Sequence, residues 1–167
     1  MRVLGVDPGI ANTGYGVVYE EKGSPRALAF GSIRTKSGAR MDERLAHIYE
    51  EMMALIEEYS PDVLALERLF FSANKKTAGA VGEARGVIIL ACFHSSVPYF
   101  EYAPLEVKMA IVGYGNAPKS QVRYMVSSVL GLPQFSPSFH AADALAIALC
   151  HLQMNKVRSK IEMAKKR

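Results

Sequence analysis

The stretch Arg2-Val-Leu-Gly-Val-Asp7-Pro8-Gly9 decides how the fold begins, because a short apolar run ends at an acid and a turn follows. This pattern is typical of a buried strand over residues 2–7 that stops where the chain reverses. Two more strands are predicted over 14–20 and about 26–35, and only short polar turns separate the three. We therefore expect the chain to open with a three-stranded antiparallel meander.

Helical and extended patterns alternate along the rest of the chain. Apolar residues spaced four, three, four, three and four apart predict a helix over 40–59. The other expected elements are strands over 63–67 and 97–103 and helices over about 75–95, 104–112, 119–130 and 137–156. The last helix should have Ser136 as its N-cap and Pro137 at its first position. This order predicts an α/β fold in which helices flank both faces of a mixed five-stranded sheet.

The composition indicates one globular domain in a reducing compartment. Half of the 167 residues are apolar, which is enough for a sizeable core. Asp7 interrupts the first apolar run, unlike a signal peptide, and no stretch approaches the roughly 20 apolar residues of a membrane helix. Cys92 and Cys150 lie far apart in apolar surroundings and are expected to be buried free thiols. These features favour a cytoplasmic protein.

Basic residues gather at the end of the chain. The net charge of +4 is compatible with a polyanionic partner but does not identify one. Six of the last twelve residues are Lys or Arg, against the single acid Glu162. We expect residues 1–155 to form the folded domain and residues 156–167 a basic tail, which in most proteins is a solvated, frayed terminus.

Two acids stand at the ends of apolar strands. Asp7 closes the first predicted strand, and Glu67 closes the strand Val63-Leu-Ala-Leu-Glu67. In open α/β sheets ligands bind at the carboxyl ends of strands, and an isolated buried carboxylate is strongly unfavourable. Each acid alone is explained as readily by helix capping or by a neighbouring arginine such as Arg68. The two acids together favour a functional site.

A third acid and a histidine lie near the start of the last predicted helix. In the segment Ser138-Phe-His140-Ala-Ala-Asp143, the His and the Asp are three residues apart and therefore share one helix face. Small and aliphatic residues follow for two turns, so this helix should pack in the core. The helix dipole is the simpler explanation for Asp143, and a structural role is the simpler one for His140 and for His151.

Carboxylates from two strand ends and one helix start would suit divalent metal ions. Mg²⁺ takes oxygen ligands and keeps several waters for substrate phosphates. Two such ions about 3.5–4 Å apart can activate a water and stabilise the leaving oxygen in phosphodiester hydrolysis. Spacing alone supports this only weakly, because acids at strand ends are common.

A series of motifs runs in order along residues 1 to about 152. It begins with Gly5-Val-Asp7-Pro-Gly9-Ile-Ala-Asn-Thr-Gly14-Tyr-Gly16-Val-Val and Leu66-Glu67-Arg-Leu-Phe70-Phe-Ser-Ala-Asn74. It continues with Ala84-Arg85-Gly86, Phe100-Glu-Tyr-Ala-Pro104, Val107-Lys108, Val112-Gly-Tyr-Gly115, Lys119-Ser-Gln-Val122 and Ala141-Ala-Asp143-Ala-Leu-Ala-Ile-Ala148. Each motif is weak alone, but the ordered set is highly specific. It resembles the RuvC-type Holliday-junction resolvases (crossover junction endodeoxyribonucleases) of the RNase H-like superfamily.

This resemblance implies an RNase H-like fold and a homodimer that nicks two strands of a four-way DNA junction symmetrically, in recombination and DNA repair. It implies Mg²⁺ or Mn²⁺ as cofactor, two ions per active site, held at Asp7, Glu67, His140 and Asp143. The long helix after Glu67 is implied to form the dimer interface; its small residues suit that role, although they also suit packing on a sheet. The implied partners besides junction DNA are the RuvA and RuvB branch-migration proteins.

One position departs from much of the family. Many members have Asp where this chain has His140, although others have His. Imidazole suits Mn²⁺ or softer ions better than Mg²⁺. We therefore expect His140 either to ligate a metal ion or to lie beside one and handle a proton.

Candidate DNA contacts follow from the same motifs. Phe70 and Phe71 lie in a polar segment, where an exposed aromatic could stack on an unpaired base; the resemblance favours Phe70, although core packing explains both as well. The resemblance places Lys108 and Lys119 near the scissile phosphate. Arg123, one turn beyond Lys119, could extend this patch. Each cation taken alone is an ordinary surface charge.

Three other functions remain open from the sequence. Another RNase H-like nuclease would act on branched DNA or RNA–DNA hybrids, although the motifs after Glu67 do not follow the pattern of the hybrid nucleases. A sugar-kinase or actin-like ATPase fragment would need a second Asp-x-Gly loop, which none of Asp42, Asp62 and Asp143 begins. A non-catalytic junction-binding protein would bind junctions without metal-dependent nicking.

Overall fold

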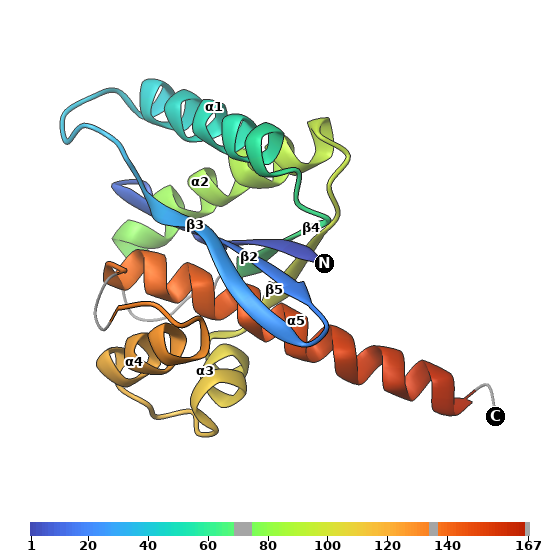
Figure 1. The fold of residues 1–167 in the computed structure, drawn as a ribbon. Coiled ribbons are helices and arrows are strands. Elements are labelled where there is room, and N and C mark those ends of the chain that lie inside the picture. Colours follow the sequence, from blue (N-terminus) through green and yellow to red (C-terminus); the bar gives the residue numbers. More distant parts are fainter. Residues whose placement is uncertain (69–74, 134–136, 166–167) are drawn as a thin grey trace.

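A five-stranded sheet forms the centre of the molecule. The computed structural model describes residues 1–68, 75–133 and 137–165. Strands β1 (Arg2–Asp7), β2 (Asn12–Glu21) and β3 (Ser24–Arg34) form an antiparallel meander. Strand β4 (Val63–Glu67) pairs parallel with β1, and β5 (Tyr99–Tyr102) pairs parallel with β4. The resulting order is β3-β2-β1-β4-β5 (Figure 1), and the predicted mixed sheet is confirmed.

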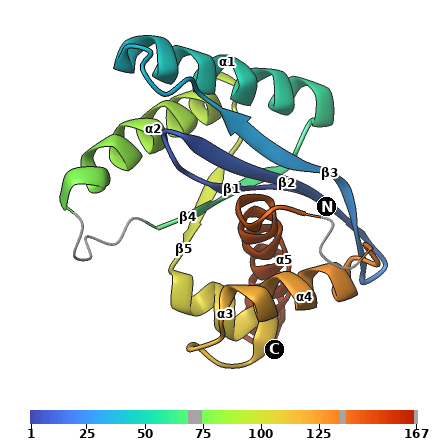
Figure 2. The same cartoon turned by 90° about the vertical axis from the view of Figure 1, so that its left-hand side faces the viewer.

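Helices cover both faces of this sheet, as predicted. On one face lie α1 (Met41–Tyr59) and α2 (Lys75–His94), which pack against each other. On the other face α5 (Phe139–Lys165) lies across the strands, and α3 (Pro104–Val112) and α4 (Lys119–Val129) pack against α5 (Figure 2). The molecule therefore has three layers, with a fourth formed locally by the two short helices.

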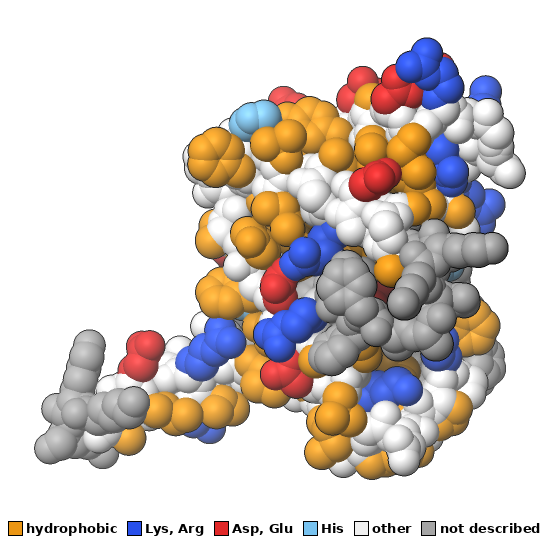
Figure 3. Space-filling model, turned by 180° about the vertical axis from the view of Figure 1, so that it is seen from behind, with side chains coloured by type: hydrophobic (Ala, Val, Ile, Leu, Met, Phe, Trp, Pro, Cys, Tyr) orange, Lys and Arg blue, Asp and Glu red, His pale blue; other side chains and the backbone are white. Residues whose placement is uncertain are grey.

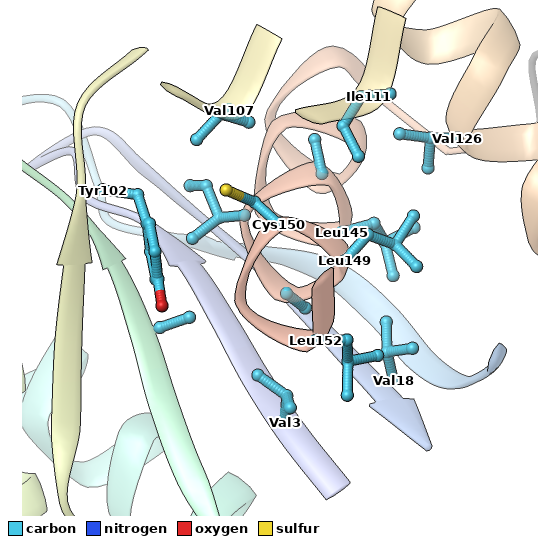
Figure 4. Packing of buried hydrophobic residues seen from close by; sticks show 14 of the residues in the cluster. Val3, Val18, Tyr102, Val107, Ile111, Val126, Leu145, Leu149, Cys150 and Leu152 are labelled. Carbon is cyan, nitrogen blue, oxygen red and sulfur yellow. The ribbon is translucent and has the colours of Figure 1, made fainter. Parts of the chain in front are cut away.

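Each face of the sheet has its own apolar core, because successive strand residues point to opposite faces. Leu4 and Val6 belong to the core under α1 and α2. Val3 belongs to the core under α5 (Figure 4). In β4 the same alternation puts Leu64 and Leu66 on the α1 side, with Val63 and Ala65 on the α5 side. This alternation fixes the direction of the acid that ends each strand.

Glycines in β1 and β2 allow α5 to lie unusually close to the sheet. A Cβ added at Gly5 would overlap the backbone carbonyl of Ala144, and one added at Gly14 would overlap the carbonyl of His140. Any side chain at these positions would therefore push the helix away. The first turns of α5 reach the edge of the sheet because Gly5 and Gly14 have no side chain.

The boundaries of α5 differ from the sequence prediction at both ends. The helix begins at Phe139, and the Ser138 hydroxyl caps it by accepting a hydrogen bond from the Ala141 amide at 3.3 Å. The predicted start with Pro137 at the first position is thus wrong, and Ser136 lies outside the described residues. At the other end the helix continues to Lys165 and projects from the body of the molecule (Figure 1), whereas the sequence predicted a tail from residue 156. Good helix formers without Gly or Pro explain the extension.

Two smaller expectations concern the thiols and membranes. Cys92 and Cys150 are buried free thiols, as predicted, and burial raises the pKa of the first to about 11 and of the second to about 12. Within the described ranges, no helix has the length and apolar character needed to cross a membrane.

Candidate active site

Strand alternation brings Asp7 and Glu67 to the same place. Asp7 lies on the same face of β1 as Val3 and Gly5, and Glu67 lies on the same face of β4 as Val63, so both acids face α5. Because β1 and β4 are parallel neighbours, their carboxyl ends meet at one edge of the sheet. Both acids are half-buried there, with 14% of the Asp7 side chain exposed.

The first turn of α5 adds the other two predicted residues. His140 lies over Asp7, with Nδ1 of its ring 2.9 Å from Oδ2 of the carboxylate. Asp143, one turn further along α5, accepts a hydrogen bond at 2.7 Å from the ammonium of Lys119 at the start of α4. The structure thus brings together all four residues that the sequence singled out from separate segments.

A pocket of about 210 Å³ forms where these elements meet. Its charged lining residues are Asp7, Glu67, Lys108, Lys119 and Asp143, and its apolar wall consists of Pro104, Val107, Val122 and Ile147. The pocket therefore lies between the carboxyl ends of β1 and β4 and the helices α3, α4 and α5. The first turns of α5 and the helices α3 and α4 lie toward the viewer in Figure 2. Three acids opposite two lysines suit a ligand that carries negative oxygens and brings cations with it.

Burial and neighbouring carboxylates raise the pKa of two acids in this pocket, Asp7 and Glu67. The pKa of Glu67 is raised to about 7, first by burial and then by the charges of Asp7 and Asp143. Burial also raises the pKa of Asp7, against the lowering effect of its hydrogen bond with His140. Burial opposes the charge on Lys119, but its hydrogen bond with Asp143 and the nearby carboxylates outweigh burial and raise the pKa of Lys119. Glu67 therefore needs positive charge nearby to be fully ionised at neutral pH.

The donor set fits a hard divalent cation. In the described part of the chain no three His, Cys, Asp or Glu side chains form a ready-made metal cage; instead, Lys119 engages Asp143 and His140 engages Asp7. Mg²⁺ does not require such a cage, because one or two carboxylates, waters and substrate phosphates complete its octahedral shell. Asp7, Glu67 and Asp143 provide those carboxylates at the rim of an open pocket, and Lys119 is a counter-charge that can exchange.

The predicted DNA contacts fall into three groups. Lys108 and Lys119 line the pocket beside the acids. Arg123 lies on α4, where its guanidinium stacks on the ring of Phe139 at 5.0 Å, so it supports the start of α5 and is not among the residues that line the pocket. Phe70 and Phe71 lie outside the described residues.

Two simpler interpretations from the sequence have different outcomes. Arg68 is exposed, and within the described ranges no ion pair joins it to Glu67; its amide donates instead to the Tyr102 carbonyl in β5. His151 does have the structural role that the sequence favoured. It is buried in α5, with its Nδ1 2.8 Å from the Tyr102 hydroxyl, and burial, followed by the charge of Arg158, lowers its pKa to about 4.

Sequence reasoning missed the ion pair between Lys119 and Asp143 and the apolar wall of the pocket. The wall residues carry no chemical signal, because Val107, Val122 and Ile147 read as ordinary core positions of three helices. The ion pair joins residues 24 positions apart, and only the packing of α4 on α5 brings them together.

Comparisons with known proteins identify the family of this chain. The family model "Crossover junction endodeoxyribonuclease RuvC" matches residues 3–151. A protein of that name from Caldicellulosiruptor saccharolyticus is 50% identical over 153 residues, which cover 91% of this chain and 92% of the relative. The solved structure of Thermus thermophilus RuvC has a TM-score of 0.87 at 37% identity, with 94% of this chain and 96% of that one covered. The structure titled T. thermophilus RuvC in complex with Holliday junction substrate has a TM-score of 0.86 at 37% identity, with 91% and 93% covered. The chain belongs to the RuvC family of crossover junction endodeoxyribonucleases.

Proposed function

We propose that this protein resolves four-way DNA junctions by metal-dependent hydrolysis of a phosphodiester bond at the pocket lined by Asp7, Glu67 and Asp143, with His140 beside Asp7. The convergence of three carboxylates from β1, β4 and α5 beside two lysines carries the proposal. A relative of the same fold at 37% identity has been solved with a Holliday junction, which supports the substrate. Family membership argues against a sugar-kinase or actin-like ATPase fragment.

Asp7, Glu67 and Asp143 would hold the divalent ions, with Mg²⁺ or Mn²⁺ as the candidates and two ions per site. Such ions supply counter-charge for the carboxylates, lower the pKa of an attacking water and stabilise charge on the leaving oxygen. The residues themselves are positioned before substrate arrives, because strand ends and a tightly packed helix hold them. This preorganisation limits the reorganisation that the chemical step requires.

The two lysines orient the DNA strand in this proposal. Lys119 has 64% of its side chain exposed while its ammonium bonds Asp143, so it can turn to a phosphate oxygen without unfolding its helix. Lys108 faces the same pocket from α3. Two cations on one side of a phosphate fix the strand with its bridging oxygens toward the acids.

His140 has two possible roles that the geometry supports. Its Nδ1 is 2.9 Å from Asp7, and 47% of its side chain is exposed. The ring can orient the Asp7 carboxylate toward the pocket and exchange a proton with solvent, or it can turn and become a metal ligand. A change of metal preference on substitution separates the two roles.

A second copy of the chain is the proposed partner of α2. Residues spaced four, three, four and three apart leave an exposed stripe on this helix: Gly79, Glu83, Gly86, Leu90 and Phe93. Phe93 has 77% of its surface exposed and Leu90 has 46%, and Figure 3 shows apolar side chains gathered over this side of the molecule. A symmetric pair of active sites would allow two strands of one junction to be nicked.

The family resemblance extends the proposal to cellular context. It supports work beside the RuvA and RuvB branch-migration proteins in the cytoplasm, during recombination and DNA repair. Co-purification with RuvA and RuvB on a synthetic junction tests this association independently of cleavage.

Substrate choice is the direct test of the proposed activity. We expect the protein with Mg²⁺ or Mn²⁺ to nick a synthetic four-way junction at paired positions on opposite strands, and to leave linear duplex and RNA–DNA hybrid essentially intact. Preferential cleavage of the hybrid would assign the chain to a different RNase H-like activity. Tight junction binding with no nicking under any divalent ion would support a non-catalytic binding protein.

A further inference from the structure

A second charged pocket lies near the same edge of the sheet, on the α1 side. It has a volume of about 290 Å³ and lies between the end of β3, the segment after it and the first two turns of α1. Its charged or titratable lining residues are Arg34, Lys36, Glu43, Arg44 and His47. Three permanent cations therefore face one acid. Figure 3 shows Lys and Arg side chains gathered around this corner of the molecule, where α1 begins.

The central cation of this pocket is tied to the loop that follows Asp7. Arg44 donates from Nε to the Thr35 hydroxyl at 2.7 Å, and that hydroxyl donates to the Ile10 carbonyl at 2.6 Å. The Thr35 amide also donates to the Ala11 carbonyl at 3.2 Å. Ile10 and Ala11 lie only three and four residues beyond Asp7. The guanidinium thus has a fixed position relative to the active site.

The cations of this pocket are available to a ligand. Among the residues that the structure describes, no acidic side chain forms an ion pair with Arg34, Lys36 or Arg44. Arg40, which stands just before α1, differs because its guanidinium pairs with Asp42 at 2.7 Å. A guanidinium held at Nε still presents its terminal N–H donors, and this fork matches two oxygens of a phosphate.

The sheet register gives the spacing between the two pockets. Asp7 pairs with Gly14, Gly14 pairs with Ser32, and Arg34 lies two residues beyond Ser32 in the direction of the active-site edge. Two strand spacings and two residue rises place the Cα atoms of Asp7 and Arg34 roughly 12 Å apart. One DNA strand carries a phosphate about every 3.4 Å along the helix axis. Measured along the axis of a DNA arm, this distance corresponds to about three or four nucleotides.

We infer that Arg34, Lys36 and Arg44 form a binding site for backbone phosphates of the junction arm that crosses the α1 side of the active site, about three or four nucleotides from the scissile phosphate. This inference rests on the proposed function. Lys108 and Lys119 hold the DNA strand on the α3 and α4 side of the acids. The pocket between β3 and α1 holds the same DNA strand on the opposite side. A strand gripped on both flanks cannot slide through the active site while the bond is cleaved.

The salt dependence of junction binding tests this site without cleavage, in an Asp7→Asn background. The slope of log K against log salt is negative, and loss of two phosphate contacts reduces its magnitude by about 1.8. Arg34→Gln with Lys36→Gln should therefore reduce this magnitude by about 1.8 and weaken binding about tenfold or more. The matched control is Lys22→Gln with Arg26→Gln, which removes the same charge at the far end of the β2–β3 hairpin. The control should change the slope by less than half as much. Arg44→Lys, which keeps the charge but loses the fork, should weaken binding about threefold to tenfold.

A phosphate-by-phosphate test locates the contact. Single neutral methylphosphonates are placed along the arm, and binding is compared between the parent and the Arg34→Gln, Lys36→Gln variant. We expect a methylphosphonate about three or four nucleotides from the cleavage position to weaken parent binding and to have little further effect on the variant. If the parent protein binds the junction strongly but the double variant and the Lys22→Gln, Arg26→Gln control have equal salt slopes, the inferred phosphate site is overturned and the proposed function is not. An acidic protein segment would then be the occupant of the pocket. Failure of the parent protein to bind the junction would overturn the proposed function and this site together.

Discussion

The pKa of Glu67 indicates that this candidate site residue opposes the stability of the metal-free fold when it is ionised. Burial and two neighbouring carboxylates raise its pKa to about 7, from an ordinary value of 4.5. The folded protein therefore binds a proton on this residue more tightly than the unfolded chain does. Stability from the protonated acid is fully present below pH 4.5 and is lost as the pH rises through about 7.

We therefore predict that Glu67→Gln stabilises the metal-free protein at pH 8 by about 1–3 kcal/mol and has almost no effect at pH 4. Chemical denaturation at both pH values measures the difference. Addition of Mg²⁺ should stabilise the parent protein but not the variant, since the cation supplies the counter-charge. The exposed acid Glu51 on α1 provides the control Glu51→Gln, which should change little at either pH. A Glu67→Gln variant less stable than the parent at pH 8 would show that the carboxylate is already compensated.

A second prediction concerns the role of His140 in cleavage. If its ring ligates a metal ion, His140→Asp should raise the ratio of cleavage rates in Mg²⁺ and Mn²⁺ by on the order of tenfold, because a carboxylate suits Mg²⁺ better. His140→Asn, which has the size of Asp without its charge, is the matched control. An unchanged ratio with a shifted pH–rate profile would assign the ring to proton transfer. A variant with neither change would exclude both roles.

Among the elements, the two strands that carry the acids, β1 and β4, could be predicted well from the sequence. Arg2–Asp7 and Val63–Glu67 have apolar runs that end at an acid, and both strands end where predicted. The face on which each acid lies follows from the same alternation. The position of both acids at one edge of the sheet therefore follows from the sequence pattern.

The start and end of α5 could not be predicted as well, for physical reasons. Ser136 and Ser138 are equally good capping residues by type, and tertiary contacts decide between them; Ser138 lies with its hydroxyl 3.4 Å from that of Ser32 in β3. The sequence predicted that the helix ends near residue 156, but Lys156 pairs with Glu20 at 2.5 Å and ties this turn of the helix to β2. Such long-range contacts leave no local pattern.

The pocket between β3 and α1 could not be predicted from the sequence either. Four cations nevertheless lie within eleven residues of the chain: Arg34, Lys36, Arg40 and Arg44. Surface cations are common in connecting segments, and the charges alone do not distinguish Arg40, which pairs with Asp42, from Arg44, which is anchored through Thr35. The hydrogen bonds that separate the two arginines exist only in the folded chain.

The close packing of α5 on β2 yields a prediction for Gly14. An added Cβ at this position would overlap the His140 carbonyl, so Gly14→Ala should move the start of α5 away from the sheet. We expect a loss of about 1–3 kcal/mol in stability from overpacking and a fall in kcat of about a hundredfold, since small displacements of catalytic groups are costly. Thermal denaturation and single-turnover cleavage measure the two effects.

Gly16→Ala is the comparison variant, because its added Cβ would chiefly meet the flexible side chain of Leu145. It should lose stability but retain most of its cleavage rate. Cleavage by Gly14→Ala at the parent rate would contradict the role given to the close approach of α5.

At the scale of the whole molecule, the exposed stripe on α2 predicts a homodimer. Phe93→Asp should shift the protein toward monomers in analytical ultracentrifugation at micromolar concentration, because Phe93 is the most exposed large apolar residue of the described chain. Paired nicks should become rare in the same variant while the fold is retained. Tyr124→Asp, at an exposed aromatic on α4, should remain dimeric. A Phe93→Asp protein that stays fully dimeric would move the interface away from α2.

Cleavage of a synthetic four-way junction by the parent protein and by Asp7→Asn, with Mg²⁺, with Mn²⁺ and with chelator, tests the central claim most directly. We predict paired, symmetric nicks by the parent only when a divalent ion is present. Asp7→Asn should bind the junction but cleave it on the order of a thousandfold more slowly, since metal-dependent stabilisation contributes several kcal/mol to the barrier. Nicking by the parent in chelator, or cleavage by Asp7→Asn at the parent rate, would contradict the assignment of this pocket as the active site.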